Sequence, residues 1–173
     1  MRGGDPTEAW FEEFFSTWEH RVGAFLVRLL GSQEAAEDVR QEAFLKTYTE
    51  RHALRLKDSP ELYLFAHARG LALHSLRSDR RRRAHQERAR VPGGDAACDL
   101  AEALFVRDLL ERYLAPSERA ILILRYIHGF SSAEVGTIME ISPVAARKRI
   151  SRITTELAQV VANTTDMVPA RCA

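Results

Sequence analysis

The chain of 173 residues is 46% hydrophobic and 28% charged, an ordinary composition for a folded protein. Its net charge of +1 excludes a global attraction to nucleic acid or membrane, so any such binding must come from local segregation of charge. Cys98 and Cys172 have no metal-ligand spacing and are expected to be free thiols in a reducing compartment. Because the chain shows no signal-peptide core and no apolar run of membrane-spanning length, we expect a cytoplasmic protein without membrane insertion.

Two amphipathic helices are predicted at the start of the chain. The first begins near Thr7, carries an aromatic stripe that is expected to be buried, and ends at Gly31. Ser32 is the expected N-cap of the second helix, which runs to about Tyr48. The predicted buried face of this second helix comprises Ala36, Val39, Ala43, Phe44 and Thr47. The opposite face is an acidic ledge made of Glu34, Glu37, Asp38, Gln41 and Glu42, with Leu45 and Tyr48 nearby. A solvated surface is the default explanation of this ledge, and a docking surface for a partner is the alternative.

A third helix is predicted after a polar loop that extends from His52 to Ser59. Ser59 and Pro60 form its start signal, and it continues to about Arg83. Its expected packing residues are Leu62, Phe65, Ala66, Leu73 and Leu76. Other helical phases carry Tyr63, His67, Arg69 and His74, and the helix ends in the arginines Arg77, Arg80, Arg81, Arg82 and Arg83. Cations bind phosphates and rings stack on bases, so this pattern fits a nucleic-acid groove; a frayed, charged helix end explains the spacing equally well.

A linker is predicted at residues 91–101, VPGGDAACDLA, where proline and glycine interrupt the helical periodicity. Since no segment has the period of a strand, the expected class is all-α, with two small helical domains at 7–90 and 102–162. The second domain is predicted to begin with helices at about Glu102 to Leu114 and at Ser117 to His128, the latter ending at Gly129. Residues 163–173 are expected to form a loose tail.

A helix-turn-helix is predicted from Ser131 to Arg152. Ser131 and Glu134 have the spacing of a capping box, Gly136 lies where two helices would cross, and Ser142 and Pro143 form a second start signal. The apolar positions of the second helix are Val144, Ala145, Ile150 and Ile153, and its cations are Arg147, Lys148, Arg149 and Arg152. A basic face free of acids suits a helix that enters a DNA major groove, while a helical hairpin with a solvated face is the plain alternative.

Three stretches in this order resemble the extracytoplasmic-function group of bacterial RNA polymerase sigma factors. They are AAEDVRQEAFLKTY (Ala35 to Tyr48), LYLFAHARGLALHSLRSDRRRR (Leu62 to Arg83) and LAPSERAILILRYIHGFSSAEVGTIMEIS (Leu114 to Ser142). The resemblance implies two helical domains and a specificity subunit that recruits polymerase to promoters and helps melt them, with no catalysis, cofactor or metal of its own. The implied partners are core RNA polymerase, through its β′ clamp and β flap, promoter DNA and an anti-sigma factor.

The resemblance also implies three sets of site residues. The clamp coiled coil of β′ would bind Asp38, Gln41, Glu42 and Phe44. The −10 element would be opened, and a flipped base held, by Arg55, Lys57, Tyr63, Arg69, His74, Arg77, Arg80 and Arg81. The −35 element would be read by Pro143, Arg147, Lys148, Arg149 and Arg152. The linker resembles the segment near the RNA exit path, where Asp95 and Asp99 would mimic nucleic-acid charge.

The chain departs from the family pattern at a few of these positions. Gly70 replaces a usual asparagine, His74 a usual aspartate, and Ala145 and Ala146 a usual Thr-Val pair. Glu140 occupies the corner of the helix-turn-helix, where glycine normally relieves a left-handed backbone, at a cost of about 1 kcal/mol. These departures are expected to alter promoter recognition more than the fold.

Two other functions remain open from the sequence. A stand-alone helix-turn-helix regulator leaves the acidic helix and the arginine cluster without a purpose, and a sigma mimic would sequester an anti-sigma factor. An enzyme is not expected, because no nucleophile–base set, phosphate-binding glycine loop or metal-ligand spacing is visible. Because the net charge is near neutral and both domains are compact, we also hypothesise that the two DNA-facing surfaces pack on each other until polymerase separates them.

Overall fold

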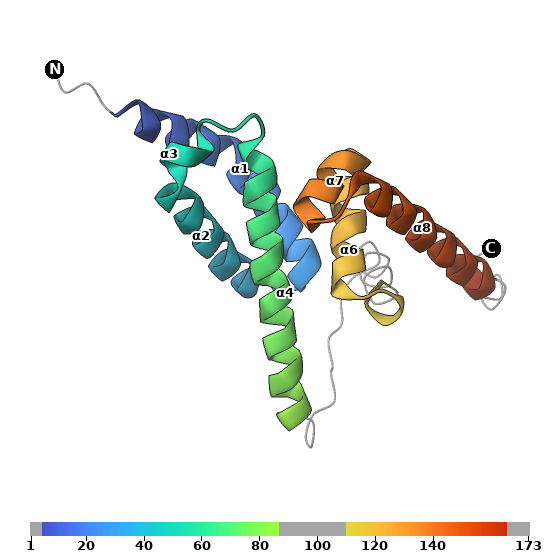
Figure 1. Ribbon diagram of the computed structural model, residues 1–173. Helices are drawn as coiled ribbons and strands as arrows, with labels where there is room; N and C mark the ends of the chain where they lie inside the picture. Colours follow the sequence, from blue (N-terminus) through green and yellow to red (C-terminus); the bar gives the residue numbers. More distant parts are fainter. Residues whose placement is uncertain (1–4, 87–109, 166–173) are drawn as a thin grey trace, which may run out of the picture.

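The computed structural model describes residues 5–86 and 110–165, which form helices and the turns between them (Figure 1). The elements are α1 (Pro6–Leu30), α2 (Gln33–Thr49), α3 (Arg51–Leu54), α4 (Pro60–Gln86), α6 (Pro116–Leu122), the π-helical turn η1 (Ile123–Ile127), α7 (Ser132–Met139) and α8 (Pro143–Thr165). The predicted all-α class is confirmed for these ranges. The predicted linker at 91–101, most of the helix expected at 102–114, and both cysteines lie outside the described residues.

The first two helices begin and end within one residue of the positions that the sequence predicts. The Asp5 carboxylate accepts a hydrogen bond from the Thr7 amide at 2.9 Å, directly ahead of α1. Gly31 ends α1 with a φ of 72°, a left-handed conformation that glycine adopts without strain. Ser32 Oγ accepts a hydrogen bond from the Ala35 amide at 3.3 Å and so caps α2.

Three segments differ from the sequence-based predictions. The loop expected from His52 contains α3, a single helical turn, because Leu54 is buried where α3 packs on α1 and α2. The helix expected to end at His128 changes its hydrogen bonding at Ile123 and continues as the π-helical turn. The last helix, α8, extends to Thr165, three residues into the tail expected at 163–173.

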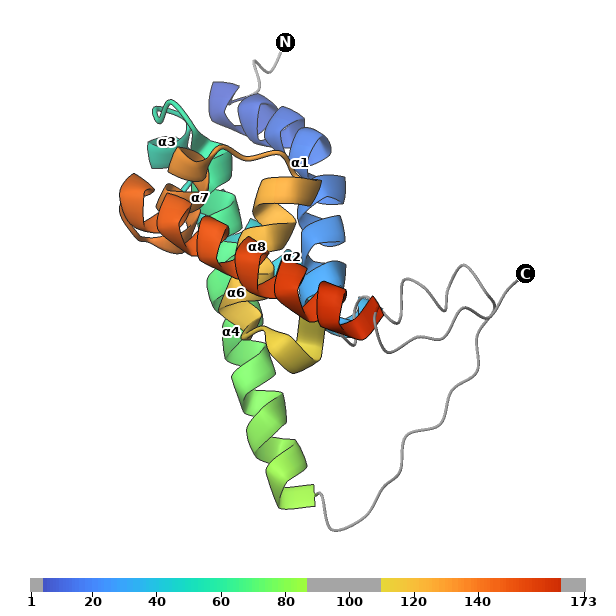
Figure 2. The same cartoon turned by 90° about the vertical axis from the view of Figure 1, so that its right-hand side faces the viewer.

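Helix α4 is the central element of the fold. It runs between α1 and α2 on one side and α6 and α7 on the other, and its C-terminal part extends beyond the other helices (Figures 1 and 2). Its buried residues are Leu62, Leu64, Phe65, Ala68 and Ala72. Of the predicted packing set, Ala66, Leu73 and Leu76 are only partly buried. A helix that packs on two sides has no single apolar stripe, so a one-face pattern describes it incompletely.

The N-terminal half (residues 5–86) and the C-terminal half (residues 110–165) share one hydrophobic core. At their junction the ring of Phe65 on α4 lies 5.0 Å from Phe130 and 5.6 Å from His128, measured between ring centroids. Phe130 ends the turn before α7, so this contact brings the helix-turn-helix against α4. The two domains expected from the sequence therefore pack on each other in this structure.

Candidate nucleic-acid and polymerase interfaces

The helix-turn-helix formed by α7 and α8 has both of its predicted caps. Ser131 Oγ accepts from the Glu134 amide at 3.2 Å, while the Ser131 amide donates to the Glu134 carboxylate at 2.7 Å. Hydrogen bonds from the side chain and the amide of Ser131 to the Glu134 carboxyl group lower the pKa of Glu134, so the carboxylate is the stable form. Ser142 Oγ accepts from the Ala145 amide at 3.2 Å ahead of α8. The predicted helix-turn-helix is confirmed.

The corner between α7 and α8 is tight. A Cβ atom added to Gly136 would lie 3.0 Å from the carbonyl oxygen of Ile141, so a side chain at this position would crowd the backbone of the turn into α8. Glu140 ends α7 with φ 58° and ψ 39°, the left-handed conformation that the family pattern assigns to glycine. The corner therefore keeps its usual shape although the residue there is glutamate.

Helix α8 presents cations to solvent and buries its apolar side. Ala146, Ile150 and Ile153 are buried and Val144 is exposed, which corrects the predicted apolar set, because Ala146 takes the place of Val144. Exposed residues on the other side are Pro143, Arg147, Lys148 and Arg149. These three cations form no ion pair with any residue in the described ranges. Such a row is available to phosphates and base edges.

Arg152 differs from the other predicted −35 cations. Its Nη2 atom lies 2.6 Å from the Glu118 carboxylate of α6, and its Nε atom lies 3.9 Å from Glu156. The guanidinium therefore links α8 to α6 in this structure.

A pair of stacked rings lies on the N-terminal part of α4. Tyr63 and His67, one helical turn apart, stack with ring centroids 6.2 Å apart and planes at 5°. The Tyr63 hydroxyl donates a hydrogen bond to the Glu50 carboxylate, and Lys46 Nζ lies 2.5 Å from the same carboxyl group. Burial and the Glu50 charge raise the pKa of Tyr63 to about 12, so the phenol stays protonated. Tyr63 was predicted as a site residue, whereas Glu50 was not.

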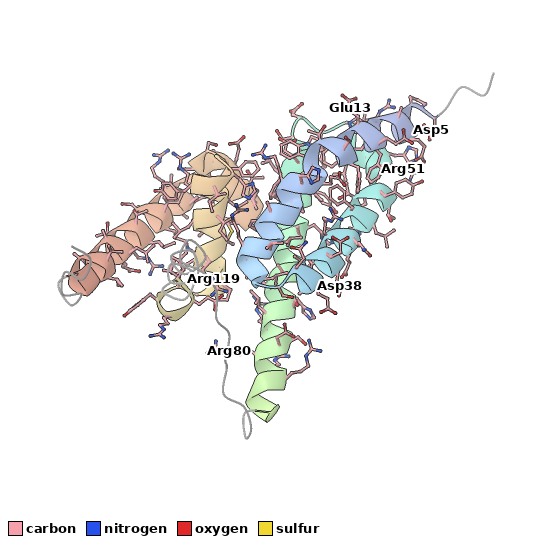
Figure 3. All side chains as sticks on the ribbon, turned by 180° about the vertical axis from the view of Figure 1, so that it is seen from behind. Asp5, Glu13, Asp38, Arg51, Arg80 and Arg119 are labelled. Carbon is pink, nitrogen blue, oxygen red and sulfur yellow. The ribbon has the colours of Figure 1, made fainter. Side chains whose placement is uncertain are left out.

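Apart from Arg69, the remaining residues of the predicted −10 set are exposed, and they lie before α4 and along it. Arg55 and Lys57 are exposed before α4, and Arg55 donates to Thr7 Oγ1 at 3.5 Å. Further exposed side chains follow along α4, namely His74, Arg77, Arg80 and Arg81. Figure 3 shows Arg80 on the part of α4 that extends beyond the other helices. This extended part is therefore a basic surface that is open to solvent.

The predicted docking ledge on α2 is exposed at Asp38, Gln41 and Glu42. Figure 3 shows Asp38 at the outer surface of α2. Phe44 is only 4% exposed and packs edge-on against Phe15, with ring centroids 4.7 Å apart. The assignment of Phe44 to the docking surface is therefore corrected, because its ring belongs to the core. Leu45, the next residue, is the exposed apolar side chain beside the acids.

The described residues were also searched for a metal site and for a membrane-spanning helix, neither of which the sequence predicts. No three histidine, cysteine, aspartate or glutamate side chains in residues 5–86 and 110–165 lie close enough together to hold a metal ion. No helix in these ranges combines the length and apolar composition needed to cross a membrane.

Comparisons with known proteins identify the two halves. The family model described as Sigma-70 region 2 matches residues 14–82, and the model described as Sigma-70, region 4, matches residues 108–157. The chain is 30% identical over 151 residues to the RNA polymerase sigma factor CarQ of Myxococcus xanthus, a match that covers 86% of this chain and 87% of that protein. The chain belongs to the extracytoplasmic-function family of RNA polymerase sigma factors. Sigma factors of this family are not enzymes.

The fold of this sigma factor is also found in a solved structure. The sigma factor RpoE of Bartonella quintana, in complex with the anti-sigma factor NepR, superposes with a TM-score of 0.69 at 19% sequence identity. The match covers 88% of this chain and 96% of that one. The resemblance at this identity is one of fold.

Region 2 and region 4 of this sigma factor are joined by polar contacts as well as by their shared core. Arg69 Nη2 on α4 lies 3.1 Å from the Glu140 carboxylate at the corner of the helix-turn-helix. Arg21 Nη2 on α1 donates to the carbonyl oxygen of His128 at 2.7 Å, and its guanidinium lies 5.7 Å from the centroid of Phe130. At this junction Arg69 of α4 is covered by the helix-turn-helix, whereas the α8 cations Arg147, Lys148 and Arg149 remain exposed.

The junction is expected to weaken on acidification because of His128. Burial, together with the charges of Arg21 and Arg28 on α1, lowers the pKa of His128 from 6.5 to about 4. The folded state therefore favours the neutral imidazole ring. The stabilisation from the neutral ring is fully present above pH 6.5 and is lost progressively as the pH falls from there toward about 4. Between about pH 7 and pH 5 we expect this sigma factor to lose at most about 2 kcal/mol in free energy of unfolding.

Urea unfolding monitored by tryptophan fluorescence measures this loss. His128→Gln is the comparison, since it removes this titrating group and leaves His67, whose pKa burial also lowers. We expect a flatter pH dependence in the variant. Equal pH dependence in both proteins would show that His128 is as accessible to protons in the folded state as in the unfolded one.

Proposed function

We propose that this sigma factor binds core RNA polymerase, recognises promoter −35 and −10 elements and assists promoter melting for transcription initiation. Region 2, residues 7–90, would bind the polymerase and the −10 element, and region 4, residues 102–162, would bind the −35 element. The proposal rests above all on α8, which presents Arg147, Lys148 and Arg149 exposed on a correctly capped helix-turn-helix, within a chain that also carries region 2. The protein would act in the cytoplasm, where promoters and polymerase meet.

The −35 element would be read in the major groove by the first turns of α8. Arginine binds guanine edges with two parallel hydrogen bonds, and lysine binds phosphates as a point charge. Pro143 at the start of the helix would lie nearest the DNA backbone. Because Arg152 is paired with Glu118, we assign base and phosphate contacts first to Arg147, Lys148 and Arg149.

The −10 element would be opened along α4. An unpaired base loses stacking within the duplex and regains it on an aromatic ring. The stacked pair Tyr63 and His67 supplies such a surface, and Glu50 holds the Tyr63 hydroxyl so that the ring is fixed in place. Exposed cations on both sides of this pair would hold phosphates: Arg55, Lys57, Arg77, Arg80 and Arg81. His74 lies among them on the same helix.

Core polymerase would dock on the ledge of Asp38, Gln41 and Glu42 through its β′ clamp, and on region 4 through its β flap. Leu45 would add an apolar contact to the ledge. A charged rim beside an apolar residue is a common composition for such an interface. An anti-sigma factor is a further proposed partner, because the similar RpoE structure contains the anti-sigma factor NepR.

Asp38→Ala is expected to weaken the association with core polymerase by roughly tenfold, as loss of one charged contact at an interface does. The free energy of unfolding should change by less than about 0.5 kcal/mol, because Asp38 is exposed. Fluorescence titration of the labelled sigma factor with core polymerase measures the association. Glu12→Ala removes an exposed acid from α1 and is the matched control. Equal affinities of the two variants would show that the docking surface lies elsewhere.

Abortive transcription with purified core polymerase tests the whole function, using genomic fragments that include the region upstream of the gene. We expect initiation that depends on this protein and on specific upstream elements. Binding to core polymerase without initiation would instead indicate a sigma mimic. Duplex binding with neither polymerase binding nor initiation would indicate a stand-alone regulator.

A further inference from the structure

An ion pair joins a predicted −10 residue to the corner of the helix-turn-helix. Arg69 Nη2 lies 3.1 Å from Glu140 Oε2, and Arg69 Nη1 lies 3.9 Å from Met139 Sδ. The Arg69 side chain is 11% exposed, whereas that of Glu140 is 75% exposed. Region 4 therefore covers a cation that the proposed function assigns to promoter DNA.

Glu140 is an unfavourable residue for the backbone conformation that it occupies. Its φ of 58° is the only positive φ among the non-glycine residues of the described ranges. Glycine would take this conformation without strain. The Glu140 side chain leaves the corner toward α4 and forms the ion pair with Arg69. Glycine at this corner could not form the ion pair with Arg69. What glutamate adds here is therefore a contact between region 4 and region 2.

Arg69 is incompletely paired in this arrangement. Its Nε atom is buried and forms no hydrogen bond with any residue that the structure describes. A planar guanidinium can bind a phosphate or carboxylate with two parallel hydrogen bonds. Glu140 satisfies one side of this fork and leaves the Nε donor unused. The site is therefore suited to an anion, and a carboxylate from region 4 occupies it.

The closed arrangement is incompatible with simultaneous binding of both promoter elements. Elements centred at −35 and −10 are separated by roughly 85 Å of B-DNA at about 3.4 Å per base pair. Glu140 contacts Arg69 and lies three residues before Pro143, so the start of α8 is within roughly 20 Å of Arg69. Region 4 must leave α4 before both surfaces can contact one promoter.

We propose that the Glu140 carboxylate acts as an intramolecular substitute for DNA on Arg69 and holds the free sigma factor in a closed, self-inhibited state. This inference rests on the proposed function, because it takes Arg69 as a ligand of the −10 strand. Breaking the pair frees the guanidinium from its anionic partner and weakens the contact between the two regions. The shared core at Phe65 and Phe130 maintains the remaining contact between the regions.

Binding of a fluorescein-labelled single-stranded oligo(dT) to the full chain, without polymerase, tests this inference. Such a strand binds through phosphates and stacking and needs no promoter sequence. Glu140→Gln removes the charge and keeps the side-chain length, so we expect binding to become roughly three- to tenfold tighter. Glu156→Gln removes an equal charge from α8 beside Arg152 and is the control; its effect should stay within about twofold. Equal binding by the two variants, or no binding by either, would overturn the inference.

A further variant separates the effect of the carboxylate from that of the strained backbone. Glu140→Gly removes both the charge and the strain, and it should bind oligo(dT) at least as tightly as Glu140→Gln. A gain in the glycine variant alone would assign the effect to the backbone and would overturn the role of the carboxylate.

Reversal of the pair gives a readout that does not depend on DNA. Fluorescence transfer is measured between labels at Glu34→Cys on α2 and Ala158→Cys on α8, both exposed positions, with Cys98 and Cys172 replaced by serine. We expect Arg69→Glu to lower the transfer and the double variant with Glu140→Arg to restore it. Failure of the double variant to restore transfer would contradict the ion pair as the latch. Transcription with core polymerase is measured separately, so absence of initiation by the native chain would contradict the proposed function alone.

Discussion

The double variant Arg147→Ala with Arg149→Ala is expected to reduce transcription from a cognate promoter by roughly a hundredfold. Each arginine contact with a base edge or phosphate contributes about 1–3 kcal/mol, so two together account for a reduction of this size. Both side chains are exposed and form no ion pair within the described residues, so their loss should leave the free energy of unfolding nearly unchanged.

Protection of the −35 element from nuclease, in the complex with core polymerase, measures this effect directly. The logarithm of the affinity should also depend less steeply on salt, since fewer counterions are released. Gln159→Ala changes an exposed residue farther along the same helix and is the control. If the upstream footprint of the double variant equals that of the native chain, another face of α8 reads the DNA.

Phe65→Ala is expected to lower the free energy of unfolding by about 3–5 kcal/mol. Phe65 is fully buried, and its ring lies 6.1 Å from Trp18, 5.6 Å from Phe25 and 5.0 Å from Phe130, measured between centroids. Truncation removes these aromatic contacts and leaves a cavity where regions 2 and 4 meet. A loss of this size is a large fraction of the stability of a domain of ordinary size.

Urea unfolding monitored by tryptophan fluorescence and by circular dichroism measures this loss. We expect both signals to shift together, because the buried residues of the two regions form one core. Phe65→Leu keeps most of the apolar volume and should lose only about a third as much. If the tryptophan signal of region 2 shifted while helix content elsewhere was retained, the two regions would be unfolding separately.

Local features of this sigma factor were predictable from its sequence. The caps at Ser32, Ser131 and Ser142 and the end of α1 at Gly31 depend on residues within four positions of one another. The buried face of α2 was also predicted, because that helix packs on one side and its apolar residues follow one stripe. The exposed cations of α8 were predictable for the same reason. This helix also packs on one side, against the other helices of region 4, and its cations lie on the opposite side.

Predictions from the sequence failed where one helix packs against neighbours on more than one side. Helix α4 contacts both regions, so its buried positions do not follow one stripe. Phe44 is buried against Phe15, as the spacing of α2 predicts, and only the family resemblance had placed it on the docking surface. The position of Glu50 beneath Tyr63 was also missed, because the two residues belong to different helices.

The sequence by itself determined the described helices other than α3 and the π-helical turn, the serine caps, the helix-turn-helix and the family of this protein, because each depends on spacing along a short stretch of chain. Only the tertiary structure decided which candidate residues are accessible. Arg69 and Glu140 are 71 positions apart, and their ion pair exists because region 4 docks on α4. The docking depends on apolar surfaces that fit together in space, and residue spacing along the chain does not record that fit.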